Sequence, residues 1–387
     1  MTAERLRTAD FDYDLPPELI AQEPLPDRAS SRMLMLLRAD RRQGGPAERR
    51  VVERPVRGPG RRSSGVFRQP AMPAGDQRSV GDGVLVDSWF AQLPSLIPAG
   101  DLLVLNTSRV RHARLLGTRP SGAPAEVLLI HPDADESWIA IGTPGSALQP
   151  GKRIALDRDV GVETLAVLGD GSRRVRFVGA TAEHAIARFG RLPLPPYIAR
   201  DPTADDEQRY QTVYARAEGS VAAPTAGLHF TPELLDTLSA KGVVVSGLDL
   251  QVGPGTFKPV DVEDPREHHM HPERYEISPR LAGLLGLVRG HGGLVWAVGT
   301  TVVRALESAA GPDGTVRAGT GETSLMITPG YPFRVVDRLL TNFHLPRSTL
   351  RMLVSAFAGH ELATAAYAHA VRQRYRFYSY GDAMVIL

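Results

Sequence analysis

The segment of this chain best suited to chemistry is a run of nine small, polar and aromatic residues that follows neither helix nor strand periodicity. It extends from Ala222 to Phe230 (AAPTAGLHF) and includes Thr225, Gly227 and His229. Irregular segments of this kind make poor core elements and often carry functional groups. His229 is a candidate general base because the unperturbed pKa of an imidazole is about 6.5.

A second irregular, polar segment supplies another imidazole. It reads Thr341-Asn342-Phe343-His344-Leu345-Pro346, and His344 and Asn342 are its candidate site residues. For both histidines an alternative stays open, in which the ring only fixes loop backbone through hydrogen bonds. We favour His229 as the base because its segment is the more unusual.

The elements that must position these residues are short apolar runs, each of which ends in a polar cluster. Four runs end in this way, before residues 106–109, 252–257, 299–301 and 341–346. Strands alternating with helices predict an α/β fold with a mostly parallel sheet. Ligands of open α/β sheets bind beyond the carboxyl ends of the strands, so the four clusters should form one pocket.

A helix is predicted directly after the nine-residue segment. Thr231-Pro232-Glu233 has the pattern of an N-cap, a first-turn proline and a first-turn acid, and Lys241-Gly242 marks the end of the helix. The irregular segment is therefore expected to lie at a helix start.

Several long motifs span most of the chain. They are residues 222–230, 252–260 (VGPGTFKPV), 267–275 (EHHMHPERY), 299–308 (GTTVVRALES), 340–346 (LTNFHLP) and 375–384 (YRFYSYGDAM). In sequence and in order these motifs resemble the S-adenosylmethionine:tRNA ribosyltransferase-isomerase family of queuosine biosynthesis.

The resemblance implies transfer and isomerisation of the ribosyl part of S-adenosylmethionine onto a 7-aminomethyl-7-deazaguanine base at the tRNA wobble position. The products would be epoxyqueuosine-tRNA, adenine and methionine. S-adenosylmethionine is a substrate here, so no cofactor is expected. Two alternatives remain: a paralogue that uses a small-molecule deazaguanine acceptor, and a non-catalytic tRNA-binding protein.

This chemistry assigns roles to other residues of the motifs. Backbone N–H groups of Gly299-Thr300-Thr301 would bind the methionyl carboxylate at a helix start, with Arg304 as a second contact. The alternative is an ordinary N-cap, with Arg304 in solvent. Glu307 and Glu322 would neutralise the sulfonium or the incoming amine.

The remaining candidates are substrate-binding positions. Gly253, Gly255 and Thr256 suggest a phosphate or ribose cradle, although a tight turn explains the glycines equally. Asn106 and Arg109 would contact substrate hydroxyls or a phosphate, or else cap the sheet edge. The resemblance adds a substrate-shaping set: His268, His271, Glu273 and Tyr275. These histidines lack the spacing and carboxylate partners typical of a metal site, so we expect no metal.

Short strands at close spacing predict a small β-barrel over residues 111–189, inserted into an α/β domain of residues 1–110 and 190–387. The turn at residues 142–147 (GTPGSA) lacks the basic residues usual in the family, which weakens a tRNA contact there. The expected strands are Ala113–Leu116, Glu126–His131, Trp138–Ile141, Arg153–Leu156, Glu163–Val167 and Arg174–Val178.

Composition limits the other possibilities. The chain has no cysteine, which excludes disulfides, thiolate zinc sites and cysteine-ligated iron–sulfur clusters. No apolar run approaches the roughly 20 residues of a membrane span, and no secretory signal is evident. We therefore expect a cytoplasmic monomer without membrane contact.

Positive charge is concentrated in one segment. Residues 38 to 83 hold eleven Arg against five acidic residues, although the net charge of the whole chain is only +2. Its Gly, Pro and Arg content predicts a disordered basic insertion over residues 40–82. It would add affinity for tRNA phosphates or have no role.

Overall fold

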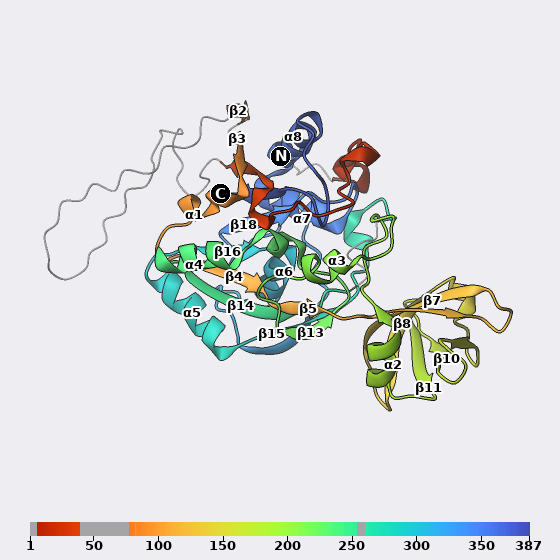
Figure 1. Ribbon diagram of the computed structural model, residues 1–387. Helices are drawn as coiled ribbons and strands as arrows, with labels where there is room; N and C mark the ends of the chain where they lie inside the picture. Colours follow the sequence, from red (N-terminus) through yellow and green to blue (C-terminus); the bar gives the residue numbers. More distant parts are fainter. Residues whose placement is uncertain (1–5, 39–76, 82, 254–259) are drawn as a thin grey trace, which may run out of the picture.

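The computed structural model describes residues 6–38, 77–81, 83–253 and 260–387. Its strands form a large sheet, a separate smaller sheet and a two-stranded pair, and the smaller sheet projects from the main body (Figure 1). In strand order, the large sheet consists of β17 (Gly319–Thr323), β15 (Glu273–Ile277), β14 (Val244–Leu250), β4 (Leu102–Asn106), β16 (Val295–Val298), β18 (Arg338–Asn342), β19 (Ala383–Ile386), β1 (Arg32–Leu37), β3 (Gly83–Trp89) and β2 (Gln77–Val80).

The large sheet is mixed, so the prediction of a mostly parallel sheet is wrong. Strands β14, β4, β16 and β18 are neighbours and parallel, as the polar clusters at their ends indicated. At one end of this group β15 and β17 pair antiparallel, and at the other end β19 pairs antiparallel with β18. Strand β19 also pairs in parallel with β1, so among the described strands it is the link between β1, β3 and β2 and the rest of the sheet.

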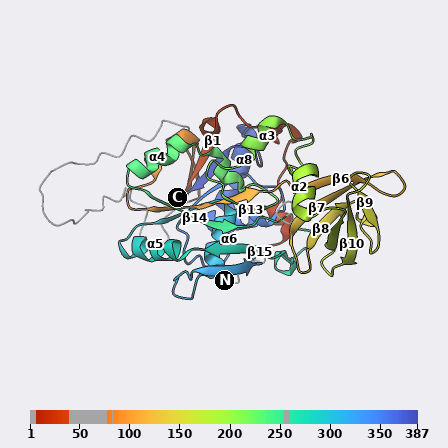
Figure 2. The same cartoon turned by 60° about the horizontal axis from the view of Figure 1, so that its bottom comes forward.

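Helices cover both faces of this sheet, because successive apolar side chains of its strands point to opposite faces. In β4, Leu102 and Val104 pack with the core under α5 to α8, whereas Leu103 and Leu105 pack with α1 and α4. The view in Figure 2 shows α5 and α4 on opposite sides of β14. The helices are α1 (Leu93–Leu96), α2 (Ala182–Phe189), α3 (Ala204–Arg209), α4 (Pro232–Ala240), α5 (Pro279–Gly290), α6 (Thr300–Ala309), α7 (Thr349–Ala358) and α8 (His360–Arg372).

The helix predicted after the irregular segment is α4. The Thr231 hydroxyl accepts a hydrogen bond from the Leu234 N–H, and Pro232 is the first helical residue. Gly242, directly after the helix, has a φ of 92°, which favours glycine.

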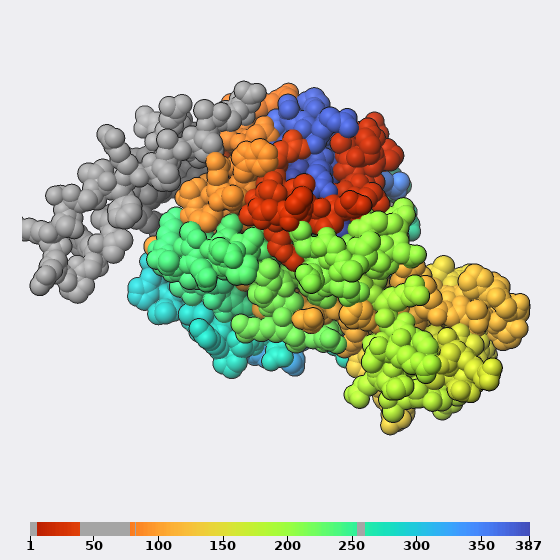
Figure 3. Space-filling model, viewed as in Figure 1, coloured from red at the N-terminus to blue at the C-terminus, as the bar shows by residue number. Residues whose placement is uncertain are grey.

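The smaller sheet is antiparallel and contains all six strands predicted between residues 113 and 178. Strand β6 (Arg114–Thr118), second in the sheet, and strand β9 (Arg153–Ala155), last in the sheet, meet at one pairing, Thr118 with Ala155. The space-filling view in Figure 3 shows it as a lobe beside the main body. In order, its strands are β12 (Gly190–Arg191), β6 (Arg114–Thr118), β7 (Pro124–Pro132), β8 (Ser137–Thr143), β11 (Arg173–Val178), β10 (Gly161–Val167) and β9 (Arg153–Ala155).

The chain leaves and re-enters the main body through two adjacent strands. These are β5 (Ser108–Val110) and β13 (Ala217–Ser220), which pair in parallel. The predicted basic insertion lies mostly outside the described residues. The prediction of disorder is wrong for residues 77–80, because Gln77–Val80 forms strand β2, which pairs with β3.

Candidate active site

A cavity lies at the carboxyl ends of the parallel strands, and three of the four predicted polar clusters contribute to it. The strands have the same direction, so the segments that follow them converge at one edge of the sheet. The lining residues are 222–226, Val252, 299–301, 341–345, Ser348, Leu350, Tyr197, Tyr378 and Ser379. This lining contains no Asp, Glu, Lys or Arg among the residues that the structure describes.

The segment Ala222 to Phe230 forms one wall of the cavity. Residues Thr225–His229 form a short 3-10 helix, and Thr225 lines the cavity whereas Gly227 does not. A Cβ atom on Gly227 would lie 2.1 Å from the hydroxyl oxygen of Tyr214. Gly227 is therefore needed for close packing beneath the wall, and it does not line the cavity.

The turn between β16 and α6 forms another part of the wall. Gly299 has a φ of 91°, which lets the chain turn sharply from the strand into the helix, and Thr300 and Thr301 are buried against the cavity. No side chain of the described ranges caps this helix N-terminus. The hydroxyl of Thr301 is buried and has no hydrogen-bond partner in the described part of the chain.

Among the described lining residues, His344 is the only histidine. Its Nε2 lies 2.8 Å from Oγ1 of Thr341, and its backbone N–H donates to the Tyr367 hydroxyl. Burial and the guanidinium of Arg351 lower the pKa of His344 to about 3. The ring is therefore neutral at pH 7, which is the form that accepts a proton.

His229 lies behind the lining and contacts the cavity through Asn342. Nδ2 of Asn342 donates to the Tyr378 carbonyl, so its Oδ1 faces Nε2 of His229, 3.2 Å away, and accepts a hydrogen bond from it. Nδ1 of His229 is 2.7 Å from the Ser31 hydroxyl, and the ring stacks on Phe90. Both ring nitrogens are thus engaged, and burial lowers the pKa of His229 to about 4.

In the polar cluster after β4, the Asn106 side chain hydrogen-bonds to backbone groups of the protein itself. The buried side chain of Asn106 accepts hydrogen bonds from the N–H groups of Ser108 and Leu250, and it donates one to the Leu250 carbonyl. These hydrogen bonds join the ends of β4 and β14. Arg109 is exposed on β5. Neither residue lines the cavity.

Glu273 and Arg304 form a buried ion pair beside the cavity. The other carboxylate oxygen of Glu273 accepts the Gly253 N–H at 2.8 Å, and Arg304 also donates to the carbonyls of Thr323 and Leu325. The alternative of a solvent-facing Arg304 is therefore wrong, whereas its substrate contact stays a prediction. The pair fixes Gly253, which follows Val252 of the lining.

The two glutamates predicted to face the sulfonium are both elsewhere. The buried carboxylate of Glu307 accepts N–H groups of Arg334, Val335 and Val336 at 2.9 to 3.0 Å. Glu322 is exposed and pairs with Arg274. Neither contributes to the lining, so a contact with the sulfonium stays a prediction for both.

The substrate-shaping set does not line the cavity either. His271 is 3.6 Å from Asp170, in the β10–β11 turn of the smaller sheet, whereas Tyr275 packs against Gly321 of β17. His268 is half-buried. Gly255 and Thr256 lie outside the described residues. Within the described ranges, no group of three or more His, Asp or Glu residues could hold a metal.

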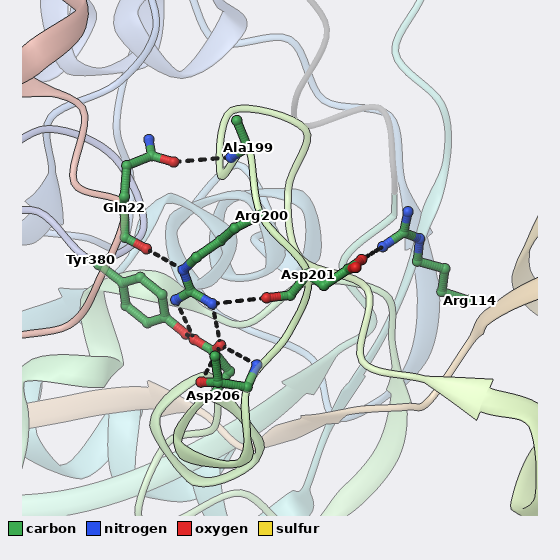
Figure 4. A network of polar contacts seen from close by, with 8 residues as sticks. Gln22, Arg114, Ala199, Arg200, Asp201, Asp206 and Tyr380 are labelled. Atoms are coloured by element: carbon green, nitrogen blue, oxygen red, sulfur yellow. Dashed lines mark hydrogen bonds and ion pairs between the residues drawn. The ribbon is translucent and has the colours of Figure 1, made fainter.

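A second, smaller hollow adjoins the first through Ser379. Its wall includes Arg28, Ser31, His229 and Tyr380. Figure 4 shows how this wall is held: the buried Asp206 accepts hydrogen bonds from Arg200 and from the Tyr380 hydroxyl. These hydrogen bonds outweigh burial and hold the pKa of Asp206 well below its usual range.

Sequence reasoning gave no site role to Ser31, Phe90 or Ser379. Ser31 and Phe90 lie far along the chain from His229, and only the packing of their segments brings them together. Ser379 carried a usable signal because it belongs to the motif at residues 375–384.

Comparison with known proteins agrees with this architecture. The family model described as "Queuosine biosynthesis protein" matches residues 8–53 and 77–386. The chain belongs to this family. Residues 54–76, within the basic segment, lie between the two matched ranges.

Similar proteins share nearly the full length. The "S-adenosylmethionine:tRNA ribosyltransferase-isomerase" of Symbiobacterium thermophilum is 46% identical over 99% of this chain and 100% of its own length. The Cupriavidus pinatubonensis protein of the same name is 48% identical, covering 98% and 99%. A crystal structure of "S-adenosylmethionine tRNA ribosyltransferase" from Thermotoga maritima matches at 33% identity and a TM-score of 0.50, over 98% of this chain and all of that one. No described helix is long and apolar enough to cross a membrane.

Proposed function

We propose that this protein is an S-adenosylmethionine:tRNA ribosyltransferase-isomerase. It transfers and isomerises the ribosyl part of S-adenosylmethionine onto the 7-aminomethyl-7-deazaguanine base at the tRNA wobble position, giving epoxyqueuosine-tRNA, adenine and methionine. The main support is one cavity lined by the motif segments 222–226, 299–301 and 341–345, in a chain of this family.

The reaction begins when a base removes a proton from the ribose carbon next to the sulfonium, whose positive charge makes that proton acidic. We assign this step to His344 because it is the histidine among the described residues that line the cavity. His229 is assigned a positioning role, because its Nε2 proton is held by Asn342 and its Nδ1 by Ser31.

The described lining has no carboxylate that could face the sulfonium cation of the substrate. Tyr197 and Tyr378 both line the cavity, with ring centroids 4.6 Å apart. Aromatic faces attract ligand cations and stack on bases. We infer that this pair faces the sulfonium or the adenine. No cofactor and no metal is assigned.

The smaller sheet is proposed to be a β-barrel domain of residues 111–189, inserted into an α/β domain of residues 1–110 and 190–387. The turn at residues 142–147 lacks a basic residue of its own. Arg173 of β11 nevertheless donates to the carbonyls of Gly145 and Leu148, which brings a guanidinium to this turn. The names of the similar proteins support tRNA over the small-molecule acceptor. We propose a cytoplasmic monomer.

The test is an incubation of the protein with S-adenosylmethionine and tRNA that carries the aminomethyl base. Adenine release is followed by chromatography, and the modified nucleoside by mass after digestion. Adenine with epoxyqueuosine in the tRNA is the expected result. Adenine release that requires a free deazaguanine nucleoside would favour the small-molecule acceptor, and tRNA binding without turnover would favour the non-catalytic protein.

A further inference from the structure

We propose that the first turn of α6, together with the Thr301 hydroxyl, is the subsite for the α-carboxylate of the methionyl group. This inference rests on the proposed function, because it assigns one end of S-adenosylmethionine to one part of the cavity. The ligand chemistry it specifies is a small carboxylate bound by hydrogen bonds.

The first observation is the unsatisfied helix start. The first N–H groups of an α-helix have no partner within the helix, and here no side chain of the described ranges supplies one. The Gly299 N–H is already used, because it donates to the Leu340 carbonyl at 2.7 Å. The N–H groups of Thr300 and Thr301 are thus left at the cavity wall that these residues line.

The second observation is the unpartnered hydroxyl. Thr301 is 8% exposed, and its Oγ1 is shielded from water without a hydrogen-bond partner among the described residues. Leaving a buried hydroxyl unpaired costs free energy, so such groups usually have a partner. A ligand oxygen in the cavity would supply one, next to the same helix start.

The third observation is the charge of the surroundings. The described lining has no Lys or Arg, and the nearby Arg304 is neutralised by Glu273. The positive end of the α6 dipole is therefore the main attraction for an anion, at a strength that suits one carboxylate. A tRNA phosphate shares the hydrogen-bonding chemistry and is the competing source.

The experiment measures equilibrium binding of two ligands by calorimetry in the absence of tRNA. The ligands are S-adenosylmethionine and its decarboxylated analogue, which keeps the sulfonium and adenosine. The proteins are wild type, Thr301→Val and a control, Thr164→Val. Thr164 is a buried threonine of β10, in the smaller sheet. Thr301→Ser retains the hydroxyl and tests whether the affinity for S-adenosylmethionine is retained with it.

Thr301→Val should weaken S-adenosylmethionine binding about tenfold and leave the decarboxylated analogue unchanged. Thr301→Ser and Thr164→Val should bind both ligands like wild type. If Thr301→Val does not fold, Thr301→Ala gives the same comparison.

Three results would overturn the subsite. The first is an equal loss of affinity for both ligands in Thr301→Val, and the second is no loss of affinity for either. The third is that inorganic phosphate competes as strongly with the analogue as with S-adenosylmethionine, which would assign the turn to a phosphate. In each case wild type still binds S-adenosylmethionine and the proposed function stands. A wild-type protein that binds neither ligand would instead reject the function together with the subsite.

Discussion

Asn342 joins His229 to the cavity: its Oδ1 is 3.2 Å from the histidine Nε2, while its Nδ2 donates to the carbonyl of Tyr378. The amide can satisfy both contacts in one orientation only, because its oxygen accepts and its nitrogen donates. His229 therefore fixes the orientation of a residue in the cavity wall, and its own ring does not line that cavity.

His229→Ala and Asn342→Ala should each lower the rate of adenine release by roughly a hundredfold, because either change frees the same piece of the wall. The double variant should be no slower than the slower single variant, since both changes break one relationship. Rates from single-turnover assays test this. Effects that multiply in the double variant would show independent roles and return His229 to candidacy as the base.

Stability should fall as the pH drops from about 6.5 towards 4. Burial lowers the pKa of His229 from 6.5 to about 4, so over this range the unfolded chain binds a proton that the folded ring does not. The contribution is present above pH 6.5 and is lost on acidification. His229→Gln should lose less stability between about pH 7.5 and about pH 5, measured by urea unfolding. An equal loss in both proteins would contradict the pKa assignment.

Glu307→Gln should destabilise the fold by about 2 kcal/mol, because a charged acceptor of three backbone N–H groups is replaced by a single amide oxygen. Glu322→Gln is the matched control; it is exposed and should change stability by less than about 0.5 kcal/mol. Thermal unfolding measures both. A drop in S-adenosylmethionine affinity without loss of stability in Glu307→Gln would support its predicted substrate role.

Gly227→Ala should be destabilising by about 1 to 3 kcal/mol, since its Cβ would overlap the Tyr214 hydroxyl. That hydroxyl has no hydrogen-bond partner in the described part of the chain. Tyr214→Phe should therefore be tolerated alone and should partly rescue Gly227→Ala. Urea unfolding of wild type, the two single variants and the double variant measures the free energy of unfolding. If Tyr214→Phe restores none of the stability lost in Gly227→Ala, the strain lies elsewhere, for example at Thr212.

Deletion of residues 54–76 should leave the fold intact and weaken the salt dependence of tRNA binding. The segment lies between the ranges that match the family, and it carries five Arg and one acidic residue, Asp76. Removing one arginine that binds a phosphate lowers the slope of log affinity against log salt by about 0.7 to 0.9. An unchanged slope would mean that this segment does not bind tRNA.

The parallel centre of the sheet was predictable because each strand carries its own signal, an apolar run before a polar cluster. The run at Leu102–Leu105 and the cluster from Asn106 became β4 and its end. The antiparallel additions carried no such signal. Strand β1 pairs with β19 about 350 residues away, and apolar periodicity specifies neither partner nor direction.

The site was predictable by segment and less so by side chain. Residues 299–301 and 341–345 line the cavity as expected, because the ends of parallel strands share one edge. Sequence does not tell which way a polar side chain points. Glu307 turns to backbone N–H groups at residues 334–336, and Arg304 to Glu273, because buried charges need partners that distant segments supply.

The position of β19 constrains the order in which the protein can form during synthesis on the ribosome. Strands β1, β3 and β2 are made early, yet within the described sheet they reach β18 only through residues 383–386. Until those residues emerge, one edge of β1 stays unpaired beside an almost complete parallel group. Nascent chains of this protein should therefore expose an unpaired strand edge until residues 383–386 have been made, which makes them candidates for chaperone binding.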